Sequence, residues 1–303
     1  ALAALVDQRL LGGARQRTLR QGLQAVIADR RVLRRSAEGH RPVERLAVQR
    51  EPHFATALLN LALACQKLGN DQKAMIFWKR LLEIDPRSEG AHLGLGNIHF
   101  SRGAFQEAQQ HFKALVERDP ADAKARNNLG LTLSQQGNFD AAMREFNQAI
   151  SLAPEYLLPR YNLGLIFLRR NELDTARSAF QEVLRLQPSH AEARLNLGLV
   201  YLAQSKHGAA KEEFEKALQS RPDFSLAHYN LGLALLGLRE FATAIGAFQN
   251  SLKHGLREPL IDYNLGLCYH GQNDRANAQR CWSVFLEKSP DSPLKEKIQG
   301  FLN

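Results

Sequence analysis

Proline recurs in this chain at a fixed interval of 34 residues. The series is Pro52, Pro86, Pro120, Pro154, Pro188 and Pro222; Leu256 takes the next position, and Pro290 resumes the series. A period of this length indicates an array of similar supersecondary units, each of which buries its apolar face only against its neighbours. The chain is therefore expected to form a stack of repeats rather than a globule around one central core.

Further columns agree when seven units are aligned from Ala55, Glu89, Ala123, Leu157, Ala191, Ser225 and Pro259. Positions 7 and 8 read Leu-Gly in six units and Leu-Ala in the first. Position 20 is alanine in every unit, and position 24 is aromatic: Trp78, Phe112, Phe146, Phe180, Phe214, Phe248 and Trp282. Small residues at positions 8 and 20 let two helices approach closely, and the aromatic fills the space beside them. Each unit is therefore predicted to be a helix A followed by a helix B that stops at the proline.

This pattern of Leu-Gly, Ala, aromatic and Pro resembles the tetratricopeptide repeat family. The resemblance covers residues 55–292 and implies an all-α fold, an α-solenoid of helix-turn-helix repeats that forms a right-handed superhelix. We expect seven repeats over 55–292 and a capping helix over 293–303, with inward-facing Leu294, Ile298 and Phe301. Left-handed backbone is expected where helix A ends, at Gly69, Gly103, Gly137, Asn171 and Asn273.

Residues 1–54 differ from the rest of the chain in charge. They hold eleven arginines and five acidic residues, so they carry +6 of the net charge of +9. The remainder is nearly balanced, and we expect no nucleic acid partner for the repeats.

Three hypotheses stay open for the basic segment 1–54. It is a helical cap or degenerate repeat, or a basic arm that touches acidic lipid or nucleic acid. Alternatively, because the apolar stretch 1–6 precedes the arginines, it is the cytoplasmic flank of a missing membrane anchor. The chain itself contains no run of eighteen apolar residues, so no part of it is expected to span a bilayer. The expected location is the cytoplasm, with or without such an anchor, because the positive flank of a membrane anchor stays inside.

The sequence carries no recognised catalytic constellation. It contains no P-loop, no His-Glu-x-x-His helix, no Gly-x-Ser-x-Gly elbow and no paired cysteine ligands. His92 and His99 are seven residues apart, roughly 10 Å along a helix, which is too far to share one ion. Cys65 and Cys268 are predicted to be small buried residues rather than nucleophiles. We therefore expect no enzymatic activity, no cofactor and no metal.

By resemblance to the family, helix A lines a concave groove, and positions 2, 5, 6, 9, 12 and 13 of each repeat face it. Position 6 is asparagine in six repeats: Asn60, Asn128, Asn162, Asn196, Asn230 and Asn264. An asparagine amide donates and accepts hydrogen bonds, so this column could bind the backbone of an extended peptide. The alternative is that the same amides tie adjacent repeats together.

Positions 5, 9 and 12 add aromatic and apolar residues to the same helices: Tyr161, Tyr229, Tyr263, Leu165, Leu199, Leu233, Leu267, Phe100, Leu168 and Leu202. Apolar residues beyond the packing stripe of a helix are typical of a partner site. The three tyrosines are expected to be exposed, since an aromatic body with a polar tip suits an interface anchor. The alternative is that part of this set packs against neighbouring helices and leaves a narrower groove.

The family includes co-chaperones that clamp a C-terminal carboxylate, and the sequence argues against that binding mode. Asn97 and Asn128 match the clamp, but Leu93, Leu158 and Asn162 stand where its basic residues belong. A chaperone-tail clamp is therefore not expected.

A column of arginines occupies position 4 of three successive repeats: Arg126, Arg160 and Arg194. One reading is a positive stripe for an acidic ligand. The other is that each arginine covers a neighbouring helix and pairs with a local carboxylate such as Glu155 or Glu192.

Two function classes follow. The favoured one is a non-catalytic protein interaction scaffold that binds a peptide or a helical segment of a partner in its groove. The partner is another protein or a second copy of this chain, and the anchor hypothesis adds the assembly of a membrane-associated complex. The alternative is the substrate-recognition region of a larger enzyme, as in glycosyltransferases that carry an asparagine-lined superhelix.

Overall fold

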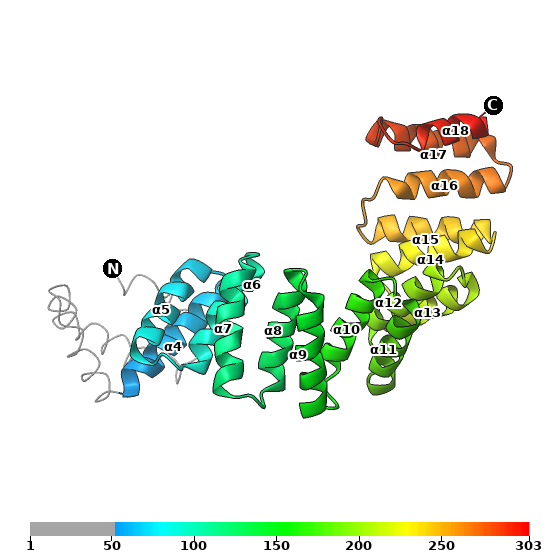
Figure 1. The fold of residues 1–303 in the computed structure, drawn as a ribbon. Helices are drawn as coiled ribbons and strands as arrows, with labels where there is room; N and C mark the ends of the chain where they lie inside the picture. Colours follow the sequence, from blue (N-terminus) through cyan, green and yellow to red (C-terminus); the bar gives the residue numbers. More distant parts are fainter. Residues whose placement is uncertain (1–51, 303) are drawn as a thin grey trace. The chain divides into compact units, whose positions relative to one another are not determined.

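The computed structural model describes residues 52–302, so the hypotheses for the basic N-terminal segment lie outside the described residues. Over 52–302 the chain forms fifteen helices and no strand (Figure 1). They are α4 (Pro52–Lys67), α5 (Asp71–Ile84), α6 (Glu89–Ser101), α7 (Phe105–Arg118), α8 (Ala123–Gln135), α9 (Phe139–Leu152), α10 (Leu157–Arg169), α11 (Leu173–Leu186), α12 (Ala191–Ala203), α13 (His207–Ser220), α14 (Ser225–Gly237), α15 (Phe241–Lys253), α16 (Leu260–Gly271), α17 (Arg275–Lys288) and α18 (Lys295–Leu302). The fold is thus an all-α solenoid of helix pairs.

The chain divides into two compact units between Ala153 and Pro154. Unit 1 holds α4 to α9, and unit 2 holds α10 to α18. The even-numbered helices from α4 to α16 are the predicted helices A, and the odd-numbered helices from α5 to α17 are the helices B. Within a unit each helix A packs on its own helix B, each helix B packs on the next helix A, and successive helices A of unit 2 also touch.

The turn from helix A to helix B contains one left-handed residue in every pair. Gly69, Gly103, Gly137, Asn171 and Asn273 have φ between 58° and 79°, as the sequence predicts. Ser205 and Arg239 occupy the same position, with φ of 58° and 62°, and this was not predicted from their residue type. In each turn the next N–H bonds to a carbonyl five residues earlier, which closes the helix end whatever side chain is present; Lys206 N to Tyr201 O is one example, at 2.8 Å.

The core of each pair forms where a glycine of helix A meets the aromatic of helix B. A Cβ built on Gly198 would lie 2.4 Å from Cε1 of Phe214, and one built on Gly164 would lie 2.6 Å from Cε1 of Phe180. Both phenylalanine rings are fully buried. The small residue at position 8 is therefore required by the close approach of a ring, as the repeat pattern predicts.

Helix α18 covers the last helix pair. Ile298 is fully buried, and Leu294 and Phe301 pack against the same cluster as Trp282. These are the three residues expected to face inward. Among residues 52–302, no helix combines the length and the apolar character that a membrane crossing requires.

Candidate functional site

The asparagine column in unit 2 is hydrogen-bonded inside the chain. Asn196 Nδ2 donates to the phenol oxygen of Tyr161 at 3.0 Å and to the carbonyl of Glu192 at 2.9 Å. Two repeats further along the chain, Asn264 Nδ2 donates to the phenol oxygen of Tyr229 at 3.3 Å. Each of these bonds to tyrosine joins position 5 of one repeat to position 6 of the next. Burial raises the pKa of both phenols, so they remain neutral partners at physiological pH.

Asn230 Nδ2 donates within its own helix, to the carbonyl of Leu226 at 2.8 Å. Asn196, Asn230 and Asn264 are all buried. Each of these amides therefore donates within the chain, and those of Asn196 and Asn264 join adjacent repeats. Asn60, Asn128 and Asn162 are half-buried.

The exposure expected for Tyr263 is wrong. Its side chain is 6% exposed, and its ring lies 5.5 Å from that of Phe285 in the cluster that α18 covers. The physical reason is the position of Tyr263 in the last pair, where the capping helix removes it from solvent. Tyr161 and Tyr229 are half-buried, and they pack on Phe180 and Phe248.

The predicted apolar residues at positions 9 and 12 are all half-buried: Phe100 in unit 1, and Leu165, Leu168, Leu199, Leu202, Leu233 and Leu267 in unit 2. Part of each side chain packs on neighbouring helices; Leu199, for example, lies against the cluster of Phe214. This packing agrees with the alternative that part of the set lies against neighbouring helices.

The most exposed apolar residues on the helices A of unit 2 stand at position 2. Leu158 is 42% exposed, Leu226 is 44% exposed and Leu260 is 45% exposed. The intervening position-2 residue is Glu192, which pairs with Arg221. Position 2 is among the groove-facing positions of the family, so this column was available in the sequence, but none of its residues was predicted as a site.

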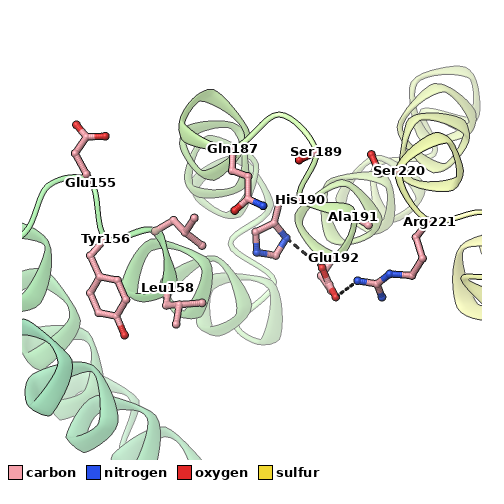
Figure 2. Close-up of a pocket in the computed structure, with 11 residues that line it drawn as sticks. Glu155, Tyr156, Leu158, Gln187, Ser189, His190, Ala191, Glu192, Ser220 and Arg221 are labelled. Atoms are coloured by element: carbon pink, nitrogen blue, oxygen red, sulfur yellow. Dashed lines mark hydrogen bonds and ion pairs between the residues drawn. The ribbon is translucent and has the colours of Figure 1, made fainter.

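A pocket of about 530 Å³ opens in unit 2 beside the first of these leucines. It lies at the starts of α10 and α12 (Figure 2), and it is lined by Glu155, Tyr156, Leu157, Leu158, Gln187, Ser189, His190, Ala191, Glu192, Ser220 and Arg221. Figure 2 shows Tyr156 and Leu158 on one side of the pocket, with Gln187 and His190 facing them and the Glu192–Arg221 pair beyond. The pocket therefore combines an apolar wall with a polar one.

The charged groups of the polar wall neutralise one another. Arg221 donates to Glu192 Oε1, and His190 Nδ1 lies 3.2 Å from Glu192 Oε2. Burial is the largest single influence on the pKa of Glu192 and would raise it. The hydrogen bond from Arg221, a backbone hydrogen bond and the electrostatic effects of Arg221 and His190 together outweigh burial and hold that pKa below its usual value. Glu192 is thus a paired carboxylate, and on the opposite wall Leu158, which is 42% exposed, offers apolar contact surface.

The side chains at position 4 also make hydrogen bonds within the chain. Side chains at this position bond to the carbonyl of the proline six residues earlier, and this holds for His92, Arg126, Arg160, Arg194 and His228. Arg126 and Arg194 pair in addition with carboxylates on helix B of the same repeat, Glu145 and Glu213, each at 2.9 Å. The pairing interpretation therefore fits Arg126 and Arg194, with Glu145 and Glu213 in place of the expected Glu155 and Glu192.

The other titratable side chains singled out in the sequence are packing residues. Cys268 is fully buried, and burial raises the pKa of its thiol to about 12, while Cys65 is half-buried with a raised pKa. His92 and His99 are half-buried. In the described part of the chain, no group of three or more His, Cys, Asp or Glu side chains is arranged to hold a metal ion.

Known proteins share the repeat and the fold. Models of the tetratricopeptide repeat match residues 55–88 and residues 91–156, 161–223, 200–255 and 229–279. No curated protein matches the chain in sequence. Among solved structures, pilF of Pseudomonas aeruginosa has a TM-score of 0.64 at 21% identity, covering 70% of this chain and 96% of its own.

Two further structures resemble the chain in the same way. YrrB, described as a TPR protein with an unusual peptide-binding site, has a TM-score of 0.56 at 18% identity, covering 62% of this chain and 97% of its own. The Cut9–Hcn1 hetero-tetramer of the APC/C has a TM-score of 0.65 at 19% identity, covering 83% of this chain and 48% of the matched one. At these identities the structures show the fold alone, whereas the repeat models span most of the sequence. The chain belongs to the tetratricopeptide repeat family.

Proposed function

We propose that the chain is a non-catalytic protein interaction scaffold whose unit 2 binds an amphipathic helix of a partner protein. A tetratricopeptide repeat solenoid is a fold typical of protein–protein interaction. The observation that carries the proposal is the leucine column at position 2, Leu158, Leu226 and Leu260, each more than 40% exposed on a helix A. The same three helices carry half-buried leucines at position 9, Leu165, Leu233 and Leu267. We name these six residues the leucine face.

The hydrogen bonding of unit 2 favours a helical partner over an extended one. An extended segment needs donors and acceptors for its own backbone, and each of the buried amides of Asn196, Asn230 and Asn264 already donates within the chain, which leaves fewer donors for a bound backbone. A helix satisfies its backbone internally and needs only apolar contact along one stripe. The leucine face supplies that contact, so helix-in-groove recognition is the mode that matches its chemistry.

The pocket beside Leu158 gives such a helix an anchor point. Its apolar wall of Tyr156 and Leu158 suits one large apolar side chain, and the paired Glu192 and Arg221 place a polar rim around it. Interfaces commonly concentrate binding free energy in a buried anchor of this kind surrounded by polar groups. We therefore expect the partner helix to carry a leucine or an aromatic residue that enters this pocket.

The experiment selects ligands for the intact chain from a phage-displayed library of amphipathic peptides and measures their affinities. Leu226→Glu and Leu158→Glu should each weaken the selected peptides at least tenfold, because a charge would be buried against an apolar stripe. Leu152→Glu is the matched control, since Leu152 is 45% exposed but lies at the end of α9, outside the leucine face.

Two results would contradict the proposal. One is a set of peptides whose affinity is unchanged in both leucine-face variants while the circular dichroism shows an intact fold. The other is the selection of extended, proline-containing peptides, because they cannot form the proposed helix. Sedimentation of the chain alone distinguishes a second copy as the occupant: a dimer that Leu226→Glu dissociates would assign the leucine face to self-association instead.

A further inference from the structure

One repeat of unit 1 replaces an ion pair with two histidines. Positions 4 and 23 of a repeat face each other across helices A and B, and in two repeats they hold Arg126 with Glu145 and Arg194 with Glu213. The repeat formed by α6 and α7 has His92 at position 4 and His111 at position 23. Their Nδ1 atoms lie 3.1 Å apart, so the histidines join the two helices where those two repeats use opposite charges.

The hydrogen bonds around His92 determine which ring nitrogen atoms of this pair carry a hydrogen. His92 Nε2 lies 3.0 Å from the carbonyl of Pro86, which can only accept, so Nε2 carries a hydrogen. In neutral His92 the Nδ1 atom is then an acceptor, and His111 Nδ1 donates to it. When both imidazoles are charged, every ring nitrogen carries a hydrogen, so the bond between the rings is lost and two cations face each other.

The surroundings of His111 oppose its protonation. Burial is the largest cause, followed by His92, His99 and Lys79, and together they lower the pKa of His111 to about 4. Among the described residues, the charged groups that act on His111 come from α5 and α6. The ring of His99 stacks on that of His111, with 5.6 Å between the ring centroids. Burial lowers the pKa of His99, Glu107 raises it, and Lys79 and Arg102 lower it.

We propose that the His92–His111 pair is an acid-labile contact, from which α6 and α7 separate more readily as the pH falls. The contact belongs to unit 1 and is independent of the leucine face in unit 2. The direction follows from linkage: a histidine whose pKa is lower in the folded chain than in the unfolded chain stabilises the fold above its unfolded pKa, and this stabilisation is lost as the pH falls. The affected window runs from about pH 6.5, the ordinary value for histidine, down to about pH 4. An arginine–glutamate pair keeps its attraction through most of this window, because a carboxylate ordinarily titrates near pH 4.

The test compares amide hydrogen exchange in residues 89–118 of the intact chain at pH 7 and pH 5, corrected for the intrinsic pH dependence of exchange. A shift of the His111 pKa to about 4 would raise the opening constant about 25-fold between these pH values, and solvent screening of the half-exposed pair reduces this to about tenfold. The double variant His92→Arg/His111→Glu installs the ion pair of the other repeats and should change less than about twofold over the same interval. Equal pH dependence in the wild type and in the folded double variant would overturn the proposal.

A second measurement needs no variant and so does not depend on how the double variant folds. Nuclear magnetic resonance titration of the wild-type chain should give His111 a pKa well below the ordinary histidine value. A pKa of about 6 or higher would overturn the proposal, because the folded pair would then accept its protons as readily as the unfolded chain.

Discussion

Phe180→Ala should lower the free energy of unfolding of unit 2 by about 3–5 kcal/mol. Phe180 is fully buried, and it packs with Ala176, Leu197 and Val200 in one cluster. The backbone of Gly164 lies against the edge of its ring, and a glycine has no side chain with which to fill the space that the ring leaves. The cost therefore includes the cavity as well as the lost transfer free energy, which places it in the range for fully buried aromatics.

The assay is urea unfolding followed by far-ultraviolet circular dichroism, with hydrogen exchange of α10 and α11 as a second readout. The second readout is needed because a repeat array can unfold in parts, and a single midpoint then does not represent the whole chain. Leu152→Ala is the control, since a truncation at a largely exposed leucine should cost under about 0.5 kcal/mol. A loss below about 1 kcal/mol for Phe180→Ala would refute the packing role of the position-24 aromatic.

A double-mutant cycle with Gly164 tests the contact itself. In the wild type, Gly164→Ala places a Cβ 2.6 Å from the ring of Phe180, and such overpacking costs about 1–3 kcal/mol. In the Phe180→Ala background the same methyl group has room, and alanine is favoured over glycine in a helix by about 1 kcal/mol. The two substitutions should therefore couple by at least about 1 kcal/mol, whereas additive effects would show that the ring and the glycine do not touch.

Three further predictions concern single positions. Arg239→Gly should stabilise the chain by about 0.5–1 kcal/mol in urea unfolding, because Arg239 has a φ of 62° that glycine adopts without strain; a destabilised variant would contradict this. Tyr161→Phe should lose about 1 kcal/mol, since it removes the hydroxyl that Asn196 Nδ2 reaches at 3.0 Å, and an unchanged midpoint would show that this tie contributes nothing. Cys268 should stay unmodified by iodoacetamide at pH 8 while the chain is folded, because burial raises its pKa to about 12; rapid labelling detected by mass spectrometry would contradict the burial.

The repeat pattern predicts the helix pairs because its columns report contacts made inside one repeat. A glycine at position 8 and an aromatic at position 24 meet within the same 34 residues, as Gly198 and Phe214 do. The same locality explains the left-handed glycines and asparagines at the ends of the helices A. The left-handed backbone of Ser205 and Arg239 was not predicted because the turn is closed by backbone hydrogen bonds. Such a turn tolerates any side chain at a modest cost in free energy.

The site was harder to predict because its residues depend on contacts between repeats. Asn196 stands at a position that faces the groove in the family, yet its Nδ2 donates a hydrogen bond to the hydroxyl of Tyr161, 35 residues earlier. Tyr263 occupies the same position as Tyr161, but α18 covers it because its repeat is the last one. Position within a repeat thus identifies the helix face, while the neighbouring repeat decides whether the side chain on that face is free.

The tie between repeats and the leucine face are linked through the same helices. Tyr161 and Asn196 join α10 to α12, and α10 also carries Leu158 and Leu165 of the leucine face. A rigid partner helix contacts several repeats at once, so the distances between leucines on successive helices must match its own stripe. In the proposed interface, the bonds from Asn196 to Tyr161 and from Asn264 to Tyr229 would hold neighbouring helices A in register and so preorganise the leucine face; preorganisation improves affinity by reducing the ordering required on binding. These two asparagines would then contribute to the proposed recognition without contacting the partner, because they fix the spacing of the leucines.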